Sequence, residues 1–177
     1  MLGVEMASTG EVACFGDDLH EAFLKAMLST GFKLPQALKI GEGRRGILFS
    51  VGGVEAKADV LPVAKAFVEM EFKIYATEGT ADFLSQNGIA VTKLYKISTG
   101  KEPNLMGALT RKEFDLIVNI PKHYSRVNVT DGYLIRRKSI DLNIPLITNV
   151  QVAKIVAEAL QMYGEEDLKI KEWGEYF

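Results

Sequence analysis

The sequence has little cysteine or histidine, and each shortage excludes a class of site. It contains one cysteine, Cys14, so a disulfide-stabilised scaffold cannot form within the chain. We expect this thiol, which lies between Ala13 and Phe15, to be buried. The two histidines, His20 and His123, are far apart and are not spaced as metal ligands. The sequence therefore predicts no zinc site.

The sequence also lacks an excess of positive charge and any long apolar run. Its formal net charge is -2, which disfavours general nucleic-acid binding. No uninterrupted run approaches the ~18 apolar residues that a membrane-spanning helix needs. The first residues include Glu5 and Glu11 and lack the basic residues of a signal peptide. We therefore expect no nucleic-acid partner and no membrane partner.

From Gly46 onward, apolar segments alternate with helical patterns. The expected strands are 46–51, 72–76, 91–97, 116–120 and 145–148, and the expected helices are 56–70, 80–86, 105–112, 133–142 and 150–163. This alternation predicts an α/β fold with a three-layer open parallel five-stranded sheet and helices on both faces. We expect Pro62 to lie in the first turn or two of its helix, where proline costs least.

The first residues do not have the pattern of a complete domain. A short strand at 2–6 and a helix that begins after Asp17 and Asp18 and ends near Gly31 cannot bury much surface together. We expect a terminal segment and linker at 1–34, the α/β domain at 35–163 and a C-terminal tail at 164–177. The tail mixes charged and aromatic residues, and we expect it to pack on another surface.

Polar and basic residues follow the expected strands, at the edge where parallel sheets bind ligands. They are Ser50, Lys57, Thr77, Gly79, Thr80, Lys96, Asn119 and Pro121. Unpaired N–H groups at a helix start, a glycine that allows close approach and nearby ammonium groups suit a phosphate or carboxylate. The same residues also fit an ordinary helix-start turn with solvated lysines. Their convergence on one edge favours an anion site.

No catalytic set is visible in the sequence. It contains no nucleophile elbow, no phosphate-binding P-loop and no pairing of cysteine with histidine, so we predict no catalytic residue. The pair Arg136 and Arg137 has no interleaved aromatic residues, which makes it weak evidence for nucleic-acid binding. We favour a structural or interface role for it, with one arginine paired to Asp131 or Asp141.

Several segments resemble a known family. Residues 5–12 (EMASTGEV) and 22–32 (AFLKAMLSTGF) resemble the end of the second ATP-grasp half of carbamoyl phosphate synthase large subunits, in their animal-type form most of all. Residues 46–160 resemble the methylglyoxal synthase-like domain that follows it in that family. The hallmarks are 72–80, which ends in ATEGT, 115–119 (DLIVN) and 132–137 (GYLIRR). The resemblance implies a methylglyoxal synthase-like, Rossmann/flavodoxin-like fold, with 1–34 as the end of the ATP-grasp domain.

The resemblance also implies a function. The chain would be an allosteric effector-binding regulatory domain that performs no chemistry itself and needs no cofactor. The parent synthase makes carbamoyl phosphate from bicarbonate, ammonia or glutamine and two ATP, for arginine and pyrimidine synthesis, with ATP, Mg or Mn, and K. The implied partners are the rest of the large subunit, the glutaminase small subunit and an effector such as UMP, IMP or acetylglutamate. Self-association through the regulatory domain is also consistent with the family. The implied location is cytoplasmic, or mitochondrial for an animal-type ammonia-dependent enzyme.

The resemblance carries over to the proposed site. The residues of nucleotide-binding relatives match Ser50, Lys57, Thr77, Thr80, Lys96 and Asn119 here. Lys96 stands where the acetylglutamate-binding form has tryptophan, which favours a phosphorylated nucleotide such as UMP or IMP. The animal-like opening segment favours acetylglutamate, so that alternative stays open.

Other family activities match less well. Leu146 stands where ornithine-responsive enzymes have tyrosine, which disfavours ornithine control. The stretch 98–103 lacks the catalytic aspartate of methylglyoxal synthases, which disfavours a lyase. A structural or oligomerising module with a vestigial pocket is the remaining alternative.

Overall fold

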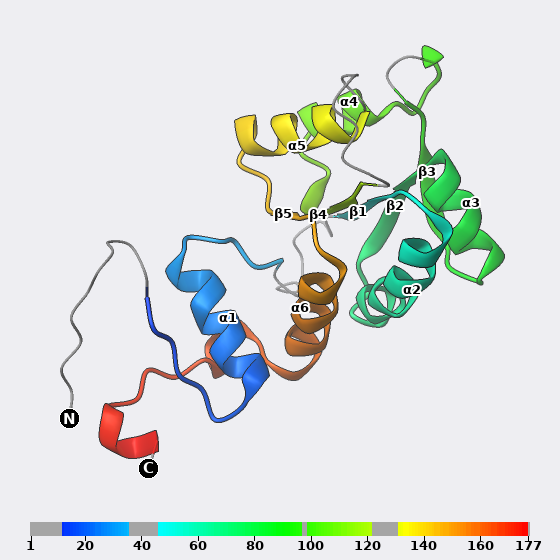
Figure 1. Ribbon diagram of the computed structural model, residues 1–177. Helices are drawn as coiled ribbons and strands as arrows, with labels where there is room; N and C mark the ends of the chain where they lie inside the picture. The colour runs from blue at the N-terminus through cyan, green and yellow to red at the C-terminus, as the bar shows by residue number, and fades with distance from the viewer. Residues whose placement is uncertain (1–11, 36–45, 97–98, 122–130, 177) are drawn as a thin grey trace.

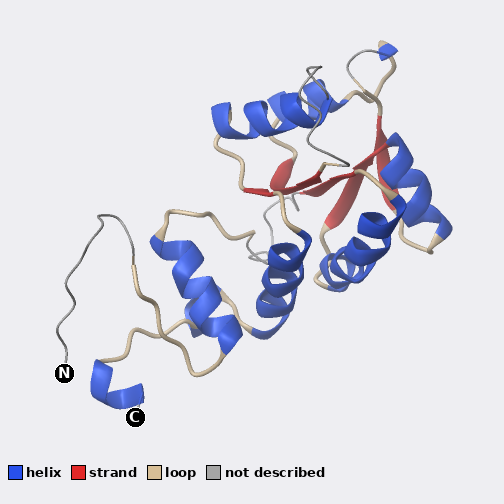
Figure 2. Cartoon of the chain, in the orientation of Figure 1, coloured by secondary structure: helices blue, strands red, loops and turns tan. Residues whose placement is uncertain are grey.

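The computed structural model describes residues 12–35, 46–96, 99–121 and 131–176, and its centre is a parallel sheet (Figure 2). The strands are β1 (Gly46–Val51), β2 (Lys73–Thr77), β3 (Val91–Leu94), β4 (Phe114–Ile120) and β5 (Leu146–Ile147). They pair in the order β3-β2-β1-β4-β5, and every pair is parallel. The predicted open five-stranded α/β sheet is confirmed.

Helices cover both faces of this sheet (Figure 1). The helices are α1 (Leu19–Ser29), α2 (Val54–Glu69), α3 (Glu78–Gln86), α4 (Leu105–Thr110), α5 (Asp131–Asp141) and α6 (Val150–Met162). In the tail, two short 3-10 turns follow, η2 (Glu165–Asp167) and η3 (Trp173–Tyr176). None of the helices in the described ranges is both long and apolar enough to cross a membrane.

The core divides into two layers because successive strand side chains point to opposite faces. In β1, Ile47 and Phe49 pack with α2, α3 and α6, whereas Leu48 packs with α4 and α5. All three side chains are fully buried. The continuous apolar run in β1 is therefore explained by helices on both sides of the sheet.

Three details differ from the sequence-based expectations. Strand β3 ends at Leu94, opposite Thr77, because its partner β2 passes into α3 at that point. Helix α2 begins at Val54, so Pro62 lies in its third turn and not in its first two. The side chain of Cys14 is half-buried, with its sulfur 3.7 Å from the Ser29 hydroxyl. The strand expected at 2–6 lies outside the described residues.

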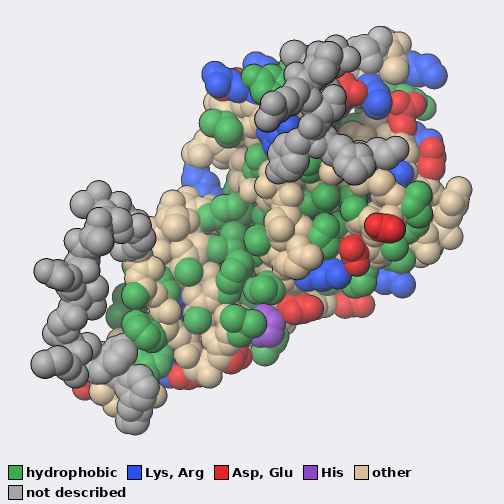
Figure 3. All heavy atoms as spheres, in the orientation of Figure 1, with side chains coloured by type: hydrophobic (Ala, Val, Ile, Leu, Met, Phe, Trp, Pro, Cys, Tyr) green, Lys and Arg blue, Asp and Glu red, His purple; other side chains and the backbone are tan. Residues whose placement is uncertain are grey.

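Helix α1 packs against the α6 side of the domain. Its side chains Phe23 and Met27 contact the core that α2 and α6 share with the sheet. In the space-filling view, hydrophobic side chains extend over the face between α1 and the sheet (Figure 3). The domain boundaries expected at 34/35 and 163/164 stay predictions.

The start of α1 is joined to the end of α6. Asp18 caps α1 as expected, since its Oδ1 accepts from the Glu21 N–H at 2.9 Å. Its Oδ2 accepts from the Tyr163 hydroxyl at 2.7 Å. The Glu21 N–H and then the Tyr163 hydroxyl lower the pKa of Asp18, and the bond to Asp18 raises the pKa of Tyr163 to about 12.

We expect Phe67→Ala to lower the free energy of unfolding by about 3–5 kcal/mol. Phe67 is fully buried, and its ring lies edge-on to Phe49 at 6.4 Å and to Phe72 at 5.6 Å between centroids. Urea denaturation measures the change. The control is Val54→Ala on the same helix, where the side chain is 77% exposed and we expect a change within about 0.5 kcal/mol. Equal effects in the two variants would contradict this description of the core.

We expect Asp18→Asn to lower the pKa of Tyr163 from about 12 toward the ordinary tyrosine value of ~10. Asparagine still caps the helix but carries no charge to hold the phenol proton. The bond between Tyr163 and Asp18 therefore stabilises the folded state below pH ~10. This stabilisation is lost as the pH rises through about 12, where the Tyr163 phenol ionises. The lowered pKa of Asp18 adds stability above pH ~3.9, and this is lost as pH falls.

The measurement is an NMR titration of the chain with carbon-13 at the tyrosine ring, with Tyr163→Phe to assign the signal. An unchanged Tyr163 titration in Asp18→Asn would show that this carboxylate does not hold the phenol.

Candidate functional site

The strand order reverses between β1 and β4, at a switch point that we call the crevice. From β1 the chain moves to β2 and then β3 on one side, and it returns to the other side of β1 for β4 and β5. The connections that follow β1 and β4 therefore diverge, and ligands of open α/β sheets bind at such a point. Ser50 of β1 lies in register with Asn119 of β4 at these strand ends.

The predicted residues at the ends of β1, β2 and β4 come together. The Thr77 hydroxyl lies 3.4 Å from the Ser50 hydroxyl, and the Asn119 amide nitrogen donates to the Ser50 carbonyl at 3.3 Å. Ser50 and Thr77 are half-buried, whereas Asn119 is 2% exposed. Two hydroxyls and one amide thus form a continuous polar edge across three neighbouring strands.

Thr80 fixes the start of α3 to the end of β1. Its hydroxyl accepts from the Val51 N–H at 3.0 Å and donates to the Val51 carbonyl at 3.2 Å. Lys57 holds the same turn from α2, because its ammonium donates to the Gly79 carbonyl at 2.7 Å. Thr80 therefore acts as a buried anchor in this structure, and the more exposed Thr77 and Gly79 form the surface of the turn.

The start of α3 has no side-chain cap, a feature that it shares with the start of α2 at Gly53. The residues directly before α1, α4 and α6 are Asp18, Asn104 and Asn149, whose side chains accept from a backbone N–H of the first turn. The residue directly before α3 is Thr77, whose side chain makes no such bond. The first N–H groups of a helix have no acceptor within the helix. In α3 they are not satisfied by a side-chain cap, so they are suited to an external anion.

Arg136 of α5 belongs to this site, although the sequence analysis favoured a structural or interface role for it. Its guanidinium donates to the Asn119 side-chain oxygen at 2.7 Å. Gly132 lies one turn earlier, and a Cβ atom there would be in ordinary van der Waals contact with Nη1 of Arg136, at 3.4 Å. Its neighbour Arg137 pairs with Asp141 at 3.2 Å, as expected for one of the two arginines. The four-residue spacing from Arg137 to Asp141 is the sequence signal that could have separated the two, because it assigns Arg137 to an ion pair on the helix surface.

Lys96 and Pro121 lie at the border of the site. The Lys96 ammonium is 3.5 Å from a carboxylate oxygen of Asp131, the first residue of α5. It is therefore directed to α5, and its contact is with this carboxylate and not with Ser50 or Thr77. Pro121 directly follows β4 and is half-buried. Lysine and arginine side chains, with acidic ones beside them, border the end of the molecule that carries α4 and α5 (Figure 3).

The chemistry of this set is that of an anion site. Its donors are hydroxyls, backbone N–H groups, a guanidinium and two ammonium groups, and the carboxylates of Glu78 and Asp131 lie among them. Within the described residues, no group of three or more metal-ligating side chains gathers anywhere. A phosphate or carboxylate uses donors of this kind directly.

We expect Thr80→Val to lower the free energy of unfolding by about 1–3 kcal/mol, because the buried hydroxyl loses both bonds to Val51 while the side-chain volume is kept. Chemical denaturation measures the loss. The control is Thr110→Val, an exposed threonine whose hydroxyl bonds to the Met106 carbonyl in α4. If both variants were as stable as the original chain, Thr80 would not be the anchor described here.

Comparison with known proteins agrees with the fold. Residues 59–148 match the model of the MGS-like domain family. The chain is 41% identical over 167 residues to the multifunctional protein ura1 of Schizosaccharomyces pombe, a match of 90% of this chain and 7% of that protein. It is 42% identical over 173 residues to the human mitochondrial carbamoyl-phosphate synthase [ammonia], a match of 96% of this chain and 11% of that protein.

A third relative is the multifunctional protein CAD of Squalus acanthias, 37% identical over 179 residues, with 93% of this chain and 8% of that protein covered. The chain thus spans about a tenth or less of the length of these relatives. The residues that the family model matches include the ends of β2 and β4 with their polar residues. The chain therefore belongs to the MGS-like domain family, as a homologue of the C-terminal region of carbamoyl phosphate synthase large subunits and CAD-type multifunctional proteins.

Proposed function

We propose that this domain is the allosteric effector-binding region of a carbamoyl phosphate synthase and that it binds a phosphorylated nucleotide such as UMP or IMP. The observation that carries the proposal is the meeting of two features at one place. The α3 start without a side-chain cap and the Asn119–Arg136 pair both adjoin the end of β1, at the crevice of the sheet.

The donors around this crevice suit a phosphate group. A phosphate dianion can accept N–H bonds from the first turn of α3 and a hydroxyl bond from Thr77. The Arg136 guanidinium has five N–H donors, and the bond to Asn119 uses one of them. Lys57 supplies compact positive charge beside Gly79, and Lys96 would supply it on leaving its pair with Asp131. Because Thr80 and Asn119 are already fixed by bonds to β1, little ordering is needed when a ligand binds.

Acetylglutamate is the second candidate, and a specific observation favours it. The chain is 42% identical to a relative whose name gives ammonia as its substrate and mitochondria as its location. A dicarboxylate would also use Arg136 and the α3 start. It would gain less from Lys96, because two carboxylates spread their charge over a longer molecule than one phosphate does.

The proposal includes partners beyond the effector. Binding of the effector would change the activity of the rest of a synthase large subunit and, through it, of a glutaminase subunit. The expected size of such coupling is ~1–3 kcal/mol. A cytoplasmic location, or a mitochondrial one for an ammonia-dependent synthase, is part of the same proposal.

We expect Lys96→Ala to weaken binding of UMP to the chain by about 10- to 100-fold, the cost of losing a bond to a charged group. Isothermal titration of the chain with UMP, IMP, acetylglutamate and inorganic phosphate measures affinity for each. The control is Lys65→Ala, which removes an exposed lysine from α2 with the same change of net charge. Unchanged affinity in Lys96→Ala would remove this lysine from the site.

The set of ligands separates the candidate functions. Stronger binding of acetylglutamate than of either nucleotide would favour the second candidate. If none of the four ligands binds or raises the melting temperature, the effector-binding function is contradicted, because a ligand specific to the native state must stabilise it. Production of methylglyoxal from dihydroxyacetone phosphate would instead indicate a lyase.

A further inference from the structure

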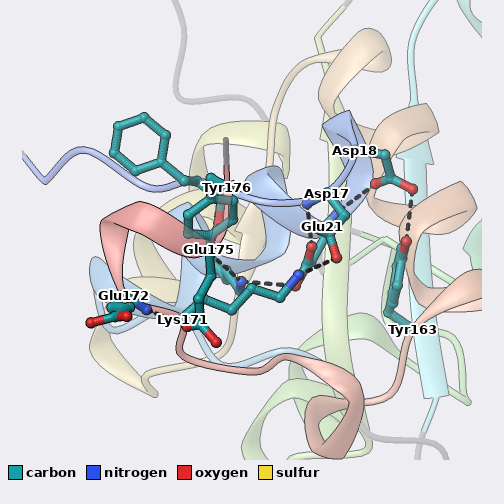
Figure 4. Close-up of polar contacts among 10 residues, drawn as sticks. Asp17, Asp18, Glu21, Tyr163, Lys171, Glu172, Glu175 and Tyr176 are labelled. Atoms are coloured by element: carbon teal, nitrogen blue, oxygen red, sulfur yellow. Dashed lines mark hydrogen bonds and ion pairs between the residues drawn. The ribbon is translucent and has the colours of Figure 1, made fainter.

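The C-terminal tail returns along the chain to contact the segment before α1 and α1 itself (Figure 4). Lys171 forms an ion pair with Asp17, just before the helix. The Tyr176 hydroxyl donates to the Phe15 carbonyl at 3.2 Å, and the two rings lie 5.9 Å apart between centroids. The tail thus contacts residues about 150 positions earlier in the sequence.

The tail also covers an ion pair on α1. Glu21 and Lys25 lie one turn apart and pair at 2.8 Å, with side chains 5% and 15% exposed. Lys25 donates to the Tyr176 hydroxyl at 3.2 Å, and its ammonium lies 5.7 Å from the centre of that ring. A pair this buried needs polar partners around it. The tail supplies one of them.

Helix α1 is therefore held from two sides. Phe23 and Met27 pack against the core on the α6 side, and Tyr163 at the end of α6 bonds to the cap residue Asp18. The tail begins directly after Tyr163 and brings Tyr176 to Lys25, the partner of Glu21.

The tail contacts are weaker than the core contacts. Asp17 is 63% exposed in its pair with Lys171, and exposed ion pairs of this kind contribute little. In the described part of the tail, no side chain belongs to either hydrophobic core of the sheet. The tail can therefore leave α1 while the sheet and its core stay intact.

We propose that residues 164–176 are a strap that fixes α1 to the domain and can open without unfolding of the sheet. With the strap closed, α1 is fixed to the C-terminal end of α6. The N-terminal end of α6 follows Asn149 and β5, so α1, α6 and the sheet move as one rigid body. With the strap open, α1 keeps its packing through Phe23 and Met27 and the Tyr163–Asp18 bond but loses the contacts of the tail, so it opens from the sheet more often. The strap thus determines how rigidly the sheet is joined to the segment before α1. This proposal does not depend on which ligand binds at the crevice.

The test is hydrogen–deuterium exchange with mass spectrometry on three forms of the chain. We expect a form truncated after Tyr163 to exchange the amides of α1 at least about 10-fold faster than the full chain, with β1 and β4 unchanged. The control is Ile170→Ala, which changes a fully exposed side chain of the tail (101%) and should leave α1 as protected as before.

A milder variant covers the case in which the truncated form does not fold. Tyr176→Phe keeps the ring but removes the hydroxyl that bonds to Phe15 and Lys25, and we expect α1 to exchange about 2- to 10-fold faster. Unchanged exchange of α1 in both Tyr176→Phe and the truncated form would overturn the proposal. Equal loss of protection in α1, β1 and β4 would also overturn it, because the tail would then support the whole fold and not α1 alone.

Discussion

The pairing of β1 with β4 is the constraint on which the site depends. The connections after these two strands leave in opposite directions, and the register sets Ser50 opposite Asn119 at their ends. A shift of one residue would turn Asn119 to the other face of the sheet and break its bond to the Ser50 carbonyl. The buried apolar residues on both faces of β1 and β4 fix that register, so the hydrophobic core determines where the polar groups of the crevice lie.

Both helices of the crevice are tied to these strand ends. Thr80 bonds α3 to Val51, and Arg136 bonds α5 to Asn119. The side chains that hold the site together are thus mostly buried, and the groups left for a ligand are the Thr77 hydroxyl, the α3 N–H groups and the basic heads. A site held in this way keeps its geometry without a ligand, which lowers the ordering cost of binding. The α1 segment is joined to the same domain through α6, at the opposite end of that helix.

Much of this arrangement could be predicted from the sequence. Continuous apolar runs predict buried strands, and the polar residues that follow parallel strands must lie at the same edge of the sheet. The residues at the ends of β1, β2 and β4 were predicted on that basis. Arg136 was missed because adjacent arginines point in different directions, and which one faces Asn119 depends on where α5 begins. The contacts of Lys96 with Asp131 and of Tyr176 with Phe15 could not be predicted from the sequence. Each contact joins two segments whose relative placement is determined only in the folded chain.

We propose that one anion binds where α3, β1 and β4 meet. The most direct measurement is a titration of the nitrogen-15-labelled chain with UMP, followed by amide chemical shifts. We expect the largest shifts at Thr77, Gly79 and Thr80, with smaller shifts at Ser50 and Asn119 and none along α1. Shifts concentrated away from these strand ends, or a spectrum unchanged at UMP concentrations that saturate related nucleotide sites, would contradict it.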